Sequence, residues 1–556
     1  MKRDRLWLLA LLFLIVTLIL LIRLFDLQII HYRFYKERAQ EQRRRVISLA
    51  ADRGDITDRR GHLLASSLDS YSLYVNPREF TSNEVLSKLL GEPTGPFDRR
   101  KLFAWVKRKV GEDLYKKIKA AEIPGIYFLT EKRRVYPKGH LASQILGFVG
   151  LDNEGLSGVE LAYERSLMGK EGKIITESDP LGYELLAVRD KSIEDASPGM
   201  VLTLTLDETI QYIAEREIQK AVRAYSAQAG CVIVMEVKTG EILALAGKPD
   251  FDPNEYTQFD PKSWKTRALD VYEPGSTFKV ITTASALEEG VIDLETRLKP
   301  LGSIKIADKT IENSHPIKLE GRSYISVSQV LEQSINTGAV QIALKLGPER
   351  FYRNIKKFGF GEPTRVGLWG ESRGLLYPYE KWNKPDIGMI SFGQTIAVTP
   401  LQLISAIGSI ANQGKRVRPI LVKKIESVDG SFIKTFTPEE AGRALSEKTA
   451  QKMVQLMENV VLYGSGRKAR LSNYRTAGKT GTAQKSIPGR RGYLKDRYIA
   501  SFIGFAPLRD PRLVTLVIVD DPRGVIWGET VAGPTFKVIM EESLRYLNVP
   551  PDIGYN

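Results

Sequence analysis

The most apolar stretch of the chain lies at its N-terminus, where Leu6 to Ile22 form a run of 17 residues without a charge. A membrane-spanning helix needs about 20 apolar residues, with about 17 at the low end of the range. The residues that follow, Arg23 to Gln28, include none of the small residues that a signal-peptide cleavage site requires. We therefore expect an uncleaved membrane anchor. Basic residues flank it on both sides, so local charge does not decide its orientation.

Further along the chain, the spacing of apolar positions predicts several helices and strands. Helices are expected at Tyr32 to Arg45, Val85 to Leu90, Ile210 to Tyr225 and Pro534 to Leu547. Strands are expected at Val201 to Leu206, Cys231 to Val237, Glu241 to Ala246, Ile499 to Phe505 and Val514 to Val519. Helical spacing dominates from Thr277 to Met457. Strands at both ends of a helical region indicate a sheet that is assembled from distant segments of the chain.

Charge and cysteine content restrict the classes of function. The formal net charge is +15, but the chain has no zinc-finger spacing and no RNA-binding aromatic motif, so nucleic acid is not an expected partner. The one cysteine, Cys231, lies in an apolar run and is predicted to be a core thiol. The four histidines are scattered and form no HExxH pattern, which leaves little material for a zinc site or a Ser-His-Asp triad. A hydrolase or transferase here would use lysine as its base.

A Ser-x-x-Lys motif, Ser276-Thr277-Phe278-Lys279, opens an apolar helix directly after Pro274-Gly275. The serine would lie in the first turn, where free backbone N–H groups favour a developing negative charge. Lys279 would share its helix face, and a lysine desolvated beside a hydroxyl can act as a general base. Two other Ser-x-x-Lys motifs, at Ser431 and Ser465, follow turn residues and do not open an apolar helix. We interpret those two as structural or surface segments.

Two further elements complete a set of Ser-x-x-Lys, Ser-x-Asn and Lys-Thr-Gly. Ser334-Ile335-Asn336 is the only Ser-x-Asn in the chain, and it lies in the segment Leu331 to Leu346, which is expected to be packed. Lys479-Thr480-Gly481-Thr482 alternates small and hydroxyl residues, which suits a strand that lines a cleft. A second Lys-Thr-Gly, at residues 238–240, is interpreted as a hairpin turn. Together, the three elements could supply a nucleophile, a base, a proton shuttle and substrate hydrogen bonds.

With these motifs, the sequence resembles the class B penicillin-binding proteins over almost its whole length. The further segments that carry the resemblance are Arg53 to Ala65, Tyr136 to Gly150, Gly155 to Glu160, Thr239 to Ala244, Asp252 to Asn254, Ser391 to Gln394, Thr399 to Gln402 and Phe502 to Pro507. The resemblance implies an α+β fold, in which a penicillin-binding transpeptidase domain stands on an elongated, β-rich pedestal behind one N-terminal transmembrane helix. That domain would have an antiparallel sheet flanked by helices and an all-helical subdomain.

The resemblance also implies a division of the chain and a set of catalytic roles. A tail and anchor would occupy residues 1–30, a pedestal of the dimerisation type 31–200, and the transpeptidase domain 201–556. Ser276 would attack the penultimate D-alanine of a stem peptide to form an acyl-enzyme, with Lys279 accepting its proton. Ser334 and Lys479 would relay a proton to the departing D-alanine, and Asn336 would hold the amide of the donor peptide.

In the same resemblance, Thr480, Gly481 and Thr482 form the substrate-binding strand, with Thr482 near the substrate carboxylate. The backbone N–H groups of Ser276 and Thr482 would form the oxyanion hole, often worth about 2.7–4 kcal/mol per donor. No cofactor and no metal are implied. β-Lactam antibiotics would act as inhibitors because they imitate D-Ala-D-Ala and trap the serine.

The resemblance further implies partners and a location. The glycan polymerase would be a separate membrane protein, a SEDS-family glycosyltransferase of the FtsW-like or RodA-like type, together with other divisome membrane proteins. The protein would be a single-pass protein of the inner membrane, with the bulk of the chain on the periplasmic, extracytoplasmic side.

Three alternatives stay open at this point. Within the family, an elongation role with a RodA-like partner competes with the septal, FtsI-like role that Ser-x-Asn and Phe358-Gly359-Phe360-Gly361 favour. A β-lactamase or D,D-carboxypeptidase would need an efficient route for water to the acyl-enzyme, which the anchor and the pedestal argue against. A non-catalytic scaffold that activates the glycosyltransferase is opposed by the intact set of serines and lysines.

Overall fold

The structure, a computed structural model, describes residues 2–49, 51–81, 83–177, 192–487, 490 and 492–553. Its contacts separate two compact units, Met1–Asp52 with Gly169–Pro198, and Arg53–Met168 with Gly199–Asn556. The first unit therefore interrupts the second in sequence. All eight predicted site residues belong to the second unit.

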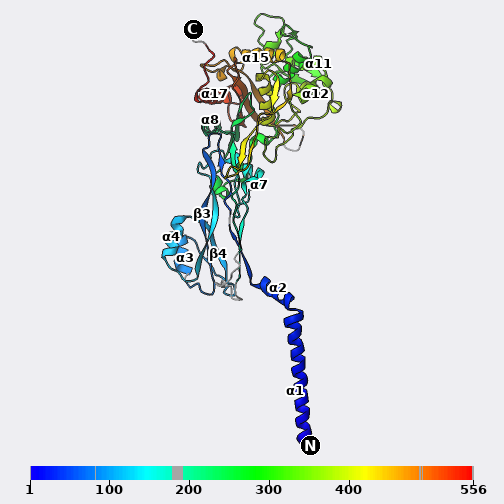
Figure 1. Ribbon diagram of the computed structural model, residues 1–556. Helices are drawn as coiled ribbons and strands as arrows, with labels where there is room; N and C mark the ends of the chain where they lie inside the picture. The colour runs from blue at the N-terminus through cyan, green and yellow to red at the C-terminus, as the bar shows by residue number, and fades with distance from the viewer. Residues whose placement is uncertain are drawn as a thin grey trace. The chain divides into compact units, whose positions relative to one another are not determined.

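The first unit contains the predicted anchor (Figure 1). The helix α1 (Lys2–Phe25) continues through a π-helical turn at Asp26–Ile30. The stretch Arg3–Ile30 is long and apolar enough to cross a membrane, and its large apolar side chains are exposed. Arg23 Nη1 lies 2.7 Å from Asp26 Oδ2, as their helical spacing predicts. One N-terminal helix thus has the properties of a single-pass anchor.

The rest of the first unit pairs strands from both of its chain segments. Its elements are α2 (Tyr32–Arg43), β1 (Arg44–Leu49), β6 (Gly172–Glu177) and β7 (Ser192–Glu194). The strand β6 lies between β1 and β7 and is antiparallel to both. The predicted helix that begins at Tyr32 is confirmed, and it ends where the sheet begins.

In the second unit, segments from both ends of the chain share one seven-stranded sheet. In spatial order, its strands are β17 (Ile433–Thr435), β16 (Val422–Glu426), β8 (Val201–Leu204), β2 (Ile56–Thr57), β3 (Leu63–Val75) and β4 (Ala104–Val110), and β5 (Ile126–Val135) also pairs with β3. Figure 1 shows α3 (Asn83–Leu90) and α4 (Glu112–Ala120) packed beside β3. Leu73 and Val75 of the sheet form a small core with Leu86 of α3 and Ile118 of α4. The helix predicted at residues 85–90 is therefore confirmed.

A buried ion network lies where this sheet meets the short helices α6 (Gly158–Ala162) and α7 (Glu164–Leu167). Glu160, which is fully buried, accepts from Arg53 Nε at 2.6 Å and from Arg134 Nε at 2.7 Å. Arg53 Nη2 also contacts Glu164 at 2.6 Å. Because each charge has a partner, the network can exist in an interior that excludes water.

A second sheet of the same unit has five antiparallel strands in the order β10-β9-β21-β20-β19. These strands are β9 (Ala229–Glu236), β10 (Ile242–Lys248), β19 (Ala477–Ser486), β20 (Tyr493–Ala506) and β21 (Leu513–Asp520). The predicted hairpin at residues 231–246 and the predicted strands at 499–505 and 514–519 are confirmed by β9, β10, β20 and β21. The antiparallel sheet therefore combines strands that lie more than 200 residues apart in sequence, as predicted.

Alternating side chains bury both faces of this sheet, because successive residues of a strand point to opposite sides. In β9, Val232 and Val234 pack with α8 (Glu208–Ala224) and α17 (Gly533–Tyr546). Ile233 and its neighbours on the other side pack with α9 (Lys279–Glu288), α14 (Pro400–Ala411) and α15 (Glu447–Leu462). The helices predicted at residues 210–225 and 534–547 are confirmed by α8 and α17. Cys231 is a buried core thiol, as predicted.

The region from residue 277 to 457 contains more than the predicted helices. Its other helices are α10 (Val327–Glu332), α11 (Asn336–Leu346), α12 (Pro348–Lys357) and α13 (Asp386–Ile390). Short strand pairs lie between them: β11 (Arg297–Leu298) with β14 (Ile325–Ser326), β12 (Ser303–Ile306) with β13 (Lys309–Glu312), and β15 (Lys415–Val417) with β18 (Glu440–Arg443). Strands of two to four residues are too short to show a period of two in sequence.

The remaining elements are short. They are α5 (Ser143–Leu146), α16 (Gly528–Val531) and the 3-10 turns Pro253–Gln258, Pro261–Trp264, Arg267–Leu269, Gly275–Phe278, Tyr379–Lys381 and Arg467–Ala469. Two of them, Gly275–Phe278 and α16, border the candidate active site.

Candidate active site

Ser276 lies in the 3-10 turn Gly275–Phe278, which leads directly into α9. Gly275 has a φ of +57°, and a Cβ there would lie 2.9 Å from the Cβ of Ala483 in β19. Only glycine allows this backbone to approach the strand so closely. Phe278 and Lys279 are fully buried, whereas Ser276 is partly exposed. The turn thus presents one hydroxyl to the pocket from the start of a buried helix, as predicted.

Lys279 Nζ contacts four oxygen atoms. It lies 2.7 Å from both Ser334 O and Asn336 Oδ1, 2.9 Å from Ser276 Oγ and 3.0 Å from Ser334 Oγ. The first two are carbonyl oxygens, which only accept, so they use both N–H groups of a neutral amine. The lone pair then faces hydroxyl groups that can donate. This arrangement suits an amine that accepts the proton of Ser276.

Both lysines of the site have a pKa below the ordinary value of a lysine side chain. Burial lowers the pKa of Lys279 well below 10.5, and the charge of Lys479 lowers it further. Burial lowers the pKa of Lys479 to about 7. Because a neutral lysine has a lone pair, each side chain can accept a proton, and the pKa of Lys479 allows it to do so near neutral pH.

Ser334 lies between the two lysines. Its Oγ is 3.0 Å from Lys279 Nζ and 3.1 Å from Lys479 Nζ, and so it can pass a proton between them. The segment 331–346 is packed, as predicted, and it is divided between two helices, because α10 ends at Glu332 and α11 begins at Asn336. Ser334 has a φ of +56° at this break, a conformation that costs energy for a residue with a Cβ.

Lys479, Thr480, Gly481 and Thr482 all lie in β19, the edge strand of the five-stranded sheet. Among the described residues, only β20 pairs with β19, so the other edge can pair with an extended peptide. A Cβ at Gly481 would lie 2.3 Å from Ser501 Oγ and 3.0 Å from Thr277 Cγ2, so glycine lets the strand pass close to the turn that carries Ser276. The predicted strand beside a cleft is therefore present.

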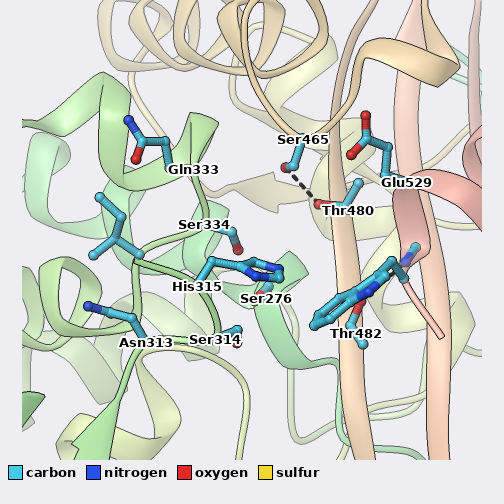
Figure 2. Close-up of a pocket in the computed structure, with 13 residues that line it drawn as sticks. Ser276, Asn313, Ser314, His315, Gln333, Ser334, Ser465, Thr480, Thr482 and Glu529 are labelled. Atoms are coloured by element: carbon cyan, nitrogen blue, oxygen red, sulfur yellow. Dashed lines mark hydrogen bonds between the residues drawn. The ribbon is translucent and has the colours of Figure 1, made fainter. Parts of the chain in front are cut away.

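One pocket collects these elements, and Figure 2 shows Ser276, Ser334, Thr480 and Thr482 facing it. Its remaining lining residues are Asn313, Ser314, His315, Gln333, Ile335, Ser465, Trp527, Gly528 and Glu529. The rings of His315 and Trp527, from loops far apart in sequence, lie with centroids 4.5 Å apart. The eight predicted site residues thus meet in one place: four line the pocket, and Lys279, Asn336, Lys479 and Gly481 contact those four or support their strand.

Sequence patterns missed part of the pocket. Ser465 was interpreted as a structural or surface residue, but it lines the pocket and its Oγ lies 2.9 Å from Thr480 Oγ1. Its motif partner Lys468 instead donates to Thr530 Oγ1 at 3.1 Å. The turn at residues 462–466 follows α15, which packs on β19, and Ser465 N also donates to Glu332 O at 2.9 Å; no local signal encodes these contacts.

The other decoy motifs are structural, as predicted. Ser431 lies in the turn between β16 and β17 and donates to Asp429 Oδ1 at 2.8 Å. The second Lys-Thr-Gly joins β9 to β10, and Lys238 Nζ contacts Asp510 at 2.7 Å. Burial raises the pKa of the Cys231 thiol to about 12, which keeps it protonated and unreactive at neutral pH.

The sequence did not predict one group of potential metal ligands, because its histidines lie far apart and form no ligand pattern. Asp58, His62 and Glu208 place their side-chain ligand atoms within 4.8 Å of one another. Protein groups already engage all three: Asp58 Oδ2 accepts from Glu208 N at 3.1 Å and contacts His62 Nδ1 at 3.1 Å, and Glu208 contacts Lys138 Nζ at 2.7 Å. The cluster is therefore explained as a hydrogen-bonded helix start at α8.

Known proteins share this architecture. The penicillin-binding protein transpeptidase domain matches residues 230–541, and the penicillin-binding protein dimerisation domain matches residues 48–204. Stage V sporulation protein D of Bacillus subtilis (strain 168) is 35% identical over 570 aligned residues, covering 99% of this chain and 86% of that protein. Peptidoglycan D,D-transpeptidase FtsI of Escherichia coli (strain K12) is 32% identical over 527 residues, covering 91% of this chain and 86% of that protein.

The structural comparison gives the same result. The crystal structure of penicillin binding protein 3 from Mycobacterium tuberculosis, complexed with aztreonam, has a TM-score of 0.71 and 27% sequence identity, and the match covers 91% of this chain and 98% of that one. Together with the sequence relatives, the fold and the matched domains identify the family. The chain therefore belongs to the class B penicillin-binding proteins.

Proposed function

We propose that this protein is a peptidoglycan D,D-transpeptidase that cross-links stem peptides through an acyl-enzyme on Ser276. The observation that carries the proposal is the position of Lys279 Nζ, 2.9 Å from Ser276 Oγ with two carbonyl oxygens occupying its N–H groups. The relatives with D,D-transpeptidase in their names support the reaction type.

Acylation begins when Ser276 Oγ gives its proton to the neutral Lys279 and attacks the carbonyl carbon of the penultimate D-alanine. The tetrahedral intermediate collapses, and the bond from that carbon to the terminal D-alanine nitrogen breaks. Ser334 Oγ passes a proton from the lysine pair to the departing nitrogen, which its contacts to Lys279 and Lys479 allow. The products are an ester on Ser276 and free D-alanine.

The edge of β19 would bind the donor peptide as an added strand. Asn336 uses its Oδ1 on Lys279 and one N–H on Glu312 O, at 2.8 Å, so its second N–H is available to the donor's amide. Thr480 and Thr482 line the same wall and would bind the terminal carboxylate. The N–H groups of Ser276 and Thr482 would stabilise the oxyanion.

Mass spectrometry after labelling tests the assignment. The full-length protein is treated with a labelled penicillin, and its intact mass and peptide map are measured. One adduct on Ser276, absent from Ser276→Ala and kept in the matched decoy variant Ser431→Ala, is the expected result. A label on any other residue refutes the assignment.

Within this reaction, we further propose a septal role at the inner membrane with an FtsW-like SEDS glycosyltransferase and other divisome proteins as partners. Support comes from the Ser-x-Asn form, from Phe358-Gly359-Phe360-Gly361 and from the similarity to FtsI over 91% of the chain. Depletion in the source bacterium should then produce filaments that cannot divide. Rounded cells would instead indicate the elongation role and a RodA-like partner.

The proposed domain limits are residues 1–30 for the tail and anchor, 31–200 for the pedestal and 201–556 for the transpeptidase domain. The matched family segments, 48–204 and 230–541, support the second and third of these. Limited proteolysis of the full-length protein should cut near residue 200, and on a denaturing gel the penicillin label should stay on the fragment whose N-terminus lies there.

A further inference from the structure

One carboxylate lines the active-site pocket without a protein partner. Among the residues that line the pocket, Glu529 is the only aspartate, glutamate, lysine or arginine. Within the described part of the chain, no hydrogen bond or ion pair engages its carboxylate. Figure 2 shows Glu529 on the wall of the pocket that also carries Thr480 and Thr482. Glu529 is partly exposed, so its carboxylate is accessible to a charged group of a ligand in the pocket.

The fold holds Glu529 at this position. Gly528, the first residue of α16, donates its N–H to Thr482 Oγ1 at 3.2 Å. A Cβ at residue 528 would lie 2.4 Å from the carbonyl oxygens of Gly481 and Ser501, so the start of α16 is pressed against β19 and β20. The nearby cation Lys468 contacts Thr530 and not Glu529. The backbone that carries Glu529 is therefore held beside the strand, and its carboxylate is available to substrate.

The charges of the substrate decide which group a carboxylate can bind here. The donor peptide ends in a carboxylate, which Glu529 cannot bind. Cross-linking also needs a primary amine from a neighbouring stem peptide, and such an amine is mostly an ammonium ion at neutral pH. The attacking amine approaches the acyl carbon from the side that the departing D-alanine vacated, because both nitrogens occupy the same position in the tetrahedral intermediate. That side is the wall of Thr480 and Thr482, where Glu529 lies.

We propose that Glu529 forms a subsite for the ammonium group of a stem peptide. The proposal rests on the proposed function, since it names a substrate group for the same pocket. Two sources share this chemistry: the amine of the acceptor stem, which the position of Glu529 favours, and an amine on the side chain of the donor stem.

Glu529 acts in this scheme by binding and not by bond formation. The bound ammonium gives one proton to the Ser334 and lysine network, and its nitrogen lone pair forms the new C–N bond. The ester bond to Ser276 breaks, and Oγ takes back a proton. The reaction consumes one ammonium group and one acyl-enzyme, and it yields one amide, one free serine and one released proton.

The test separates acylation from amine attack in the detergent-solubilised full-length protein. The enzyme is acylated with an uncharged D-alanyl thioester, and the rate constants for attack by D-alaninamide, which is cationic, and by hydroxylamine, which is neutral at pH 7, are measured. Glu529→Gln should slow attack by D-alaninamide about threefold to tenfold at low salt, and by less at high salt. Attack by hydroxylamine and acylation by penicillin should stay within about twofold of wild type.

A matched variant controls for the loss of a negative charge in a first helical turn. Glu447→Gln makes the same change in the first turn of α15, away from the lining residues, and should leave all three rates unchanged. If Glu529→Gln keeps the D-alaninamide rate, Glu529 does not bind the acceptor amine. If the variant lowers the D-alaninamide, hydroxylamine and penicillin rates equally, its effect is structural and the ammonium subsite does not exist.

A second arm identifies the source of the ammonium. Two thioester donors are compared, one with a free side-chain amine and one with that amine acetylated. Slower acylation of Glu529→Gln by the first donor alone assigns the subsite to the donor stem, and a loss confined to D-alaninamide assigns it to the acceptor. A loss in neither arm overturns the proposal. A wild-type enzyme that penicillin does not acylate would instead refute the proposed function.

Discussion

Burial governs the chemistry of single residues in this active site. Lys279 and Lys479 are each fully buried, so the interior penalises their charged forms. Their contacts differ in a useful way, because Lys279 meets Ser276 and Lys479 does not, while Ser334 touches both. Lys279 can therefore take the proton of Ser276, and Ser334 can pass a proton between Lys279 and Lys479.

The rate of acylation by penicillin should therefore fall as the pH falls, because protonation of Lys279 removes the lone pair that activates Ser276. Its pKa is lowered below 10.5 by burial first and by the charge of Lys479 second. Lys479→Met removes the second cause, so the pKa of Lys279 should rise and the acidic limb of the profile should move to higher pH. Stopped-flow measurement of the acylation rate across the pH range detects this shift. If the acidic limb of the Lys479→Met profile coincides with that of wild type, the prediction is wrong.

Ser334 should matter for its hydroxyl more than for its backbone. Ser334→Ala should slow acylation about 10²-fold or more, since it removes the bridge between the two lysines. Ser334→Gly should lose as much rate but unfold at a higher temperature than the alanine variant, because glycine accepts a φ of +56° without strain. If either variant is acylated at the wild-type rate, proton transfer through this hydroxyl is excluded.

At the level of elements, the site is built where two segments press on the edge strand β19. The turn that carries Ser276 packs on Ala483, and the start of α16 packs on Gly481. Glycines at 275 and 528 make both approaches possible, because any Cβ would overlap the strand. The distance between nucleophile and substrate strand is therefore set by backbone contact and not by long side chains.

Substituting Gly528 tests this dependence on close packing. Gly528→Ala places a Cβ 2.4 Å from two carbonyl oxygens, so the helix start must shift, at a cost of about 1–3 kcal/mol in the free energy of unfolding. Acylation should slow together with the loss of stability. Gly302→Ala is the matched control, because a Cβ there meets nothing within 4 Å. Chemical denaturation and penicillin labelling measure both, and equal stability of the two variants would exclude the packing argument.

At the scale of the whole molecule, the second unit depends on contacts between segments that are distant in sequence. The seven-stranded sheet places β2 beside β8 and β8 beside β16, so residues near 56, 202 and 425 share one surface. The ion network around Glu160 ties Arg53 to Arg134 within the same unit. These contacts stabilise the platform of the catalytic domain without taking part in its chemistry.

Glu160→Gln should destabilise the protein by about 3–5 kcal/mol, because it leaves two buried guanidinium groups without their shared carboxylate. The acylation rate per folded molecule should stay at the wild-type level, since no member of the network lines the pocket. Glu112→Gln, which breaks an exposed pair with Lys116, should change the melting temperature little. Calorimetry with penicillin labelling distinguishes the outcomes, and a lower acylation rate in folded Glu160→Gln would contradict a purely structural role.

Local patterns were sufficient for the elements that repeat a period over many residues, and for the chemistry of the motifs. The amphipathic spacing of α8 and α17 and the apolar run of β9 could each be recognised without any other part of the chain. The short strand pairs between residues 297 and 443 could not, because their stability comes from tertiary contacts and not from their own sequence.

By itself, the sequence determined which residues could act as nucleophile, base and substrate strand, because residue type and local order carry that information. Only the tertiary structure decided that Ser276, Ser334 and Thr480 face one pocket, that burial lowers the pKa of Lys479 to about 7, and that Ser465 and Glu529 join them. These outcomes depend on desolvation and on contacts between segments as far apart in sequence as Ser276 and Glu529. Such contacts form when the chain packs, and no short stretch of sequence encodes them.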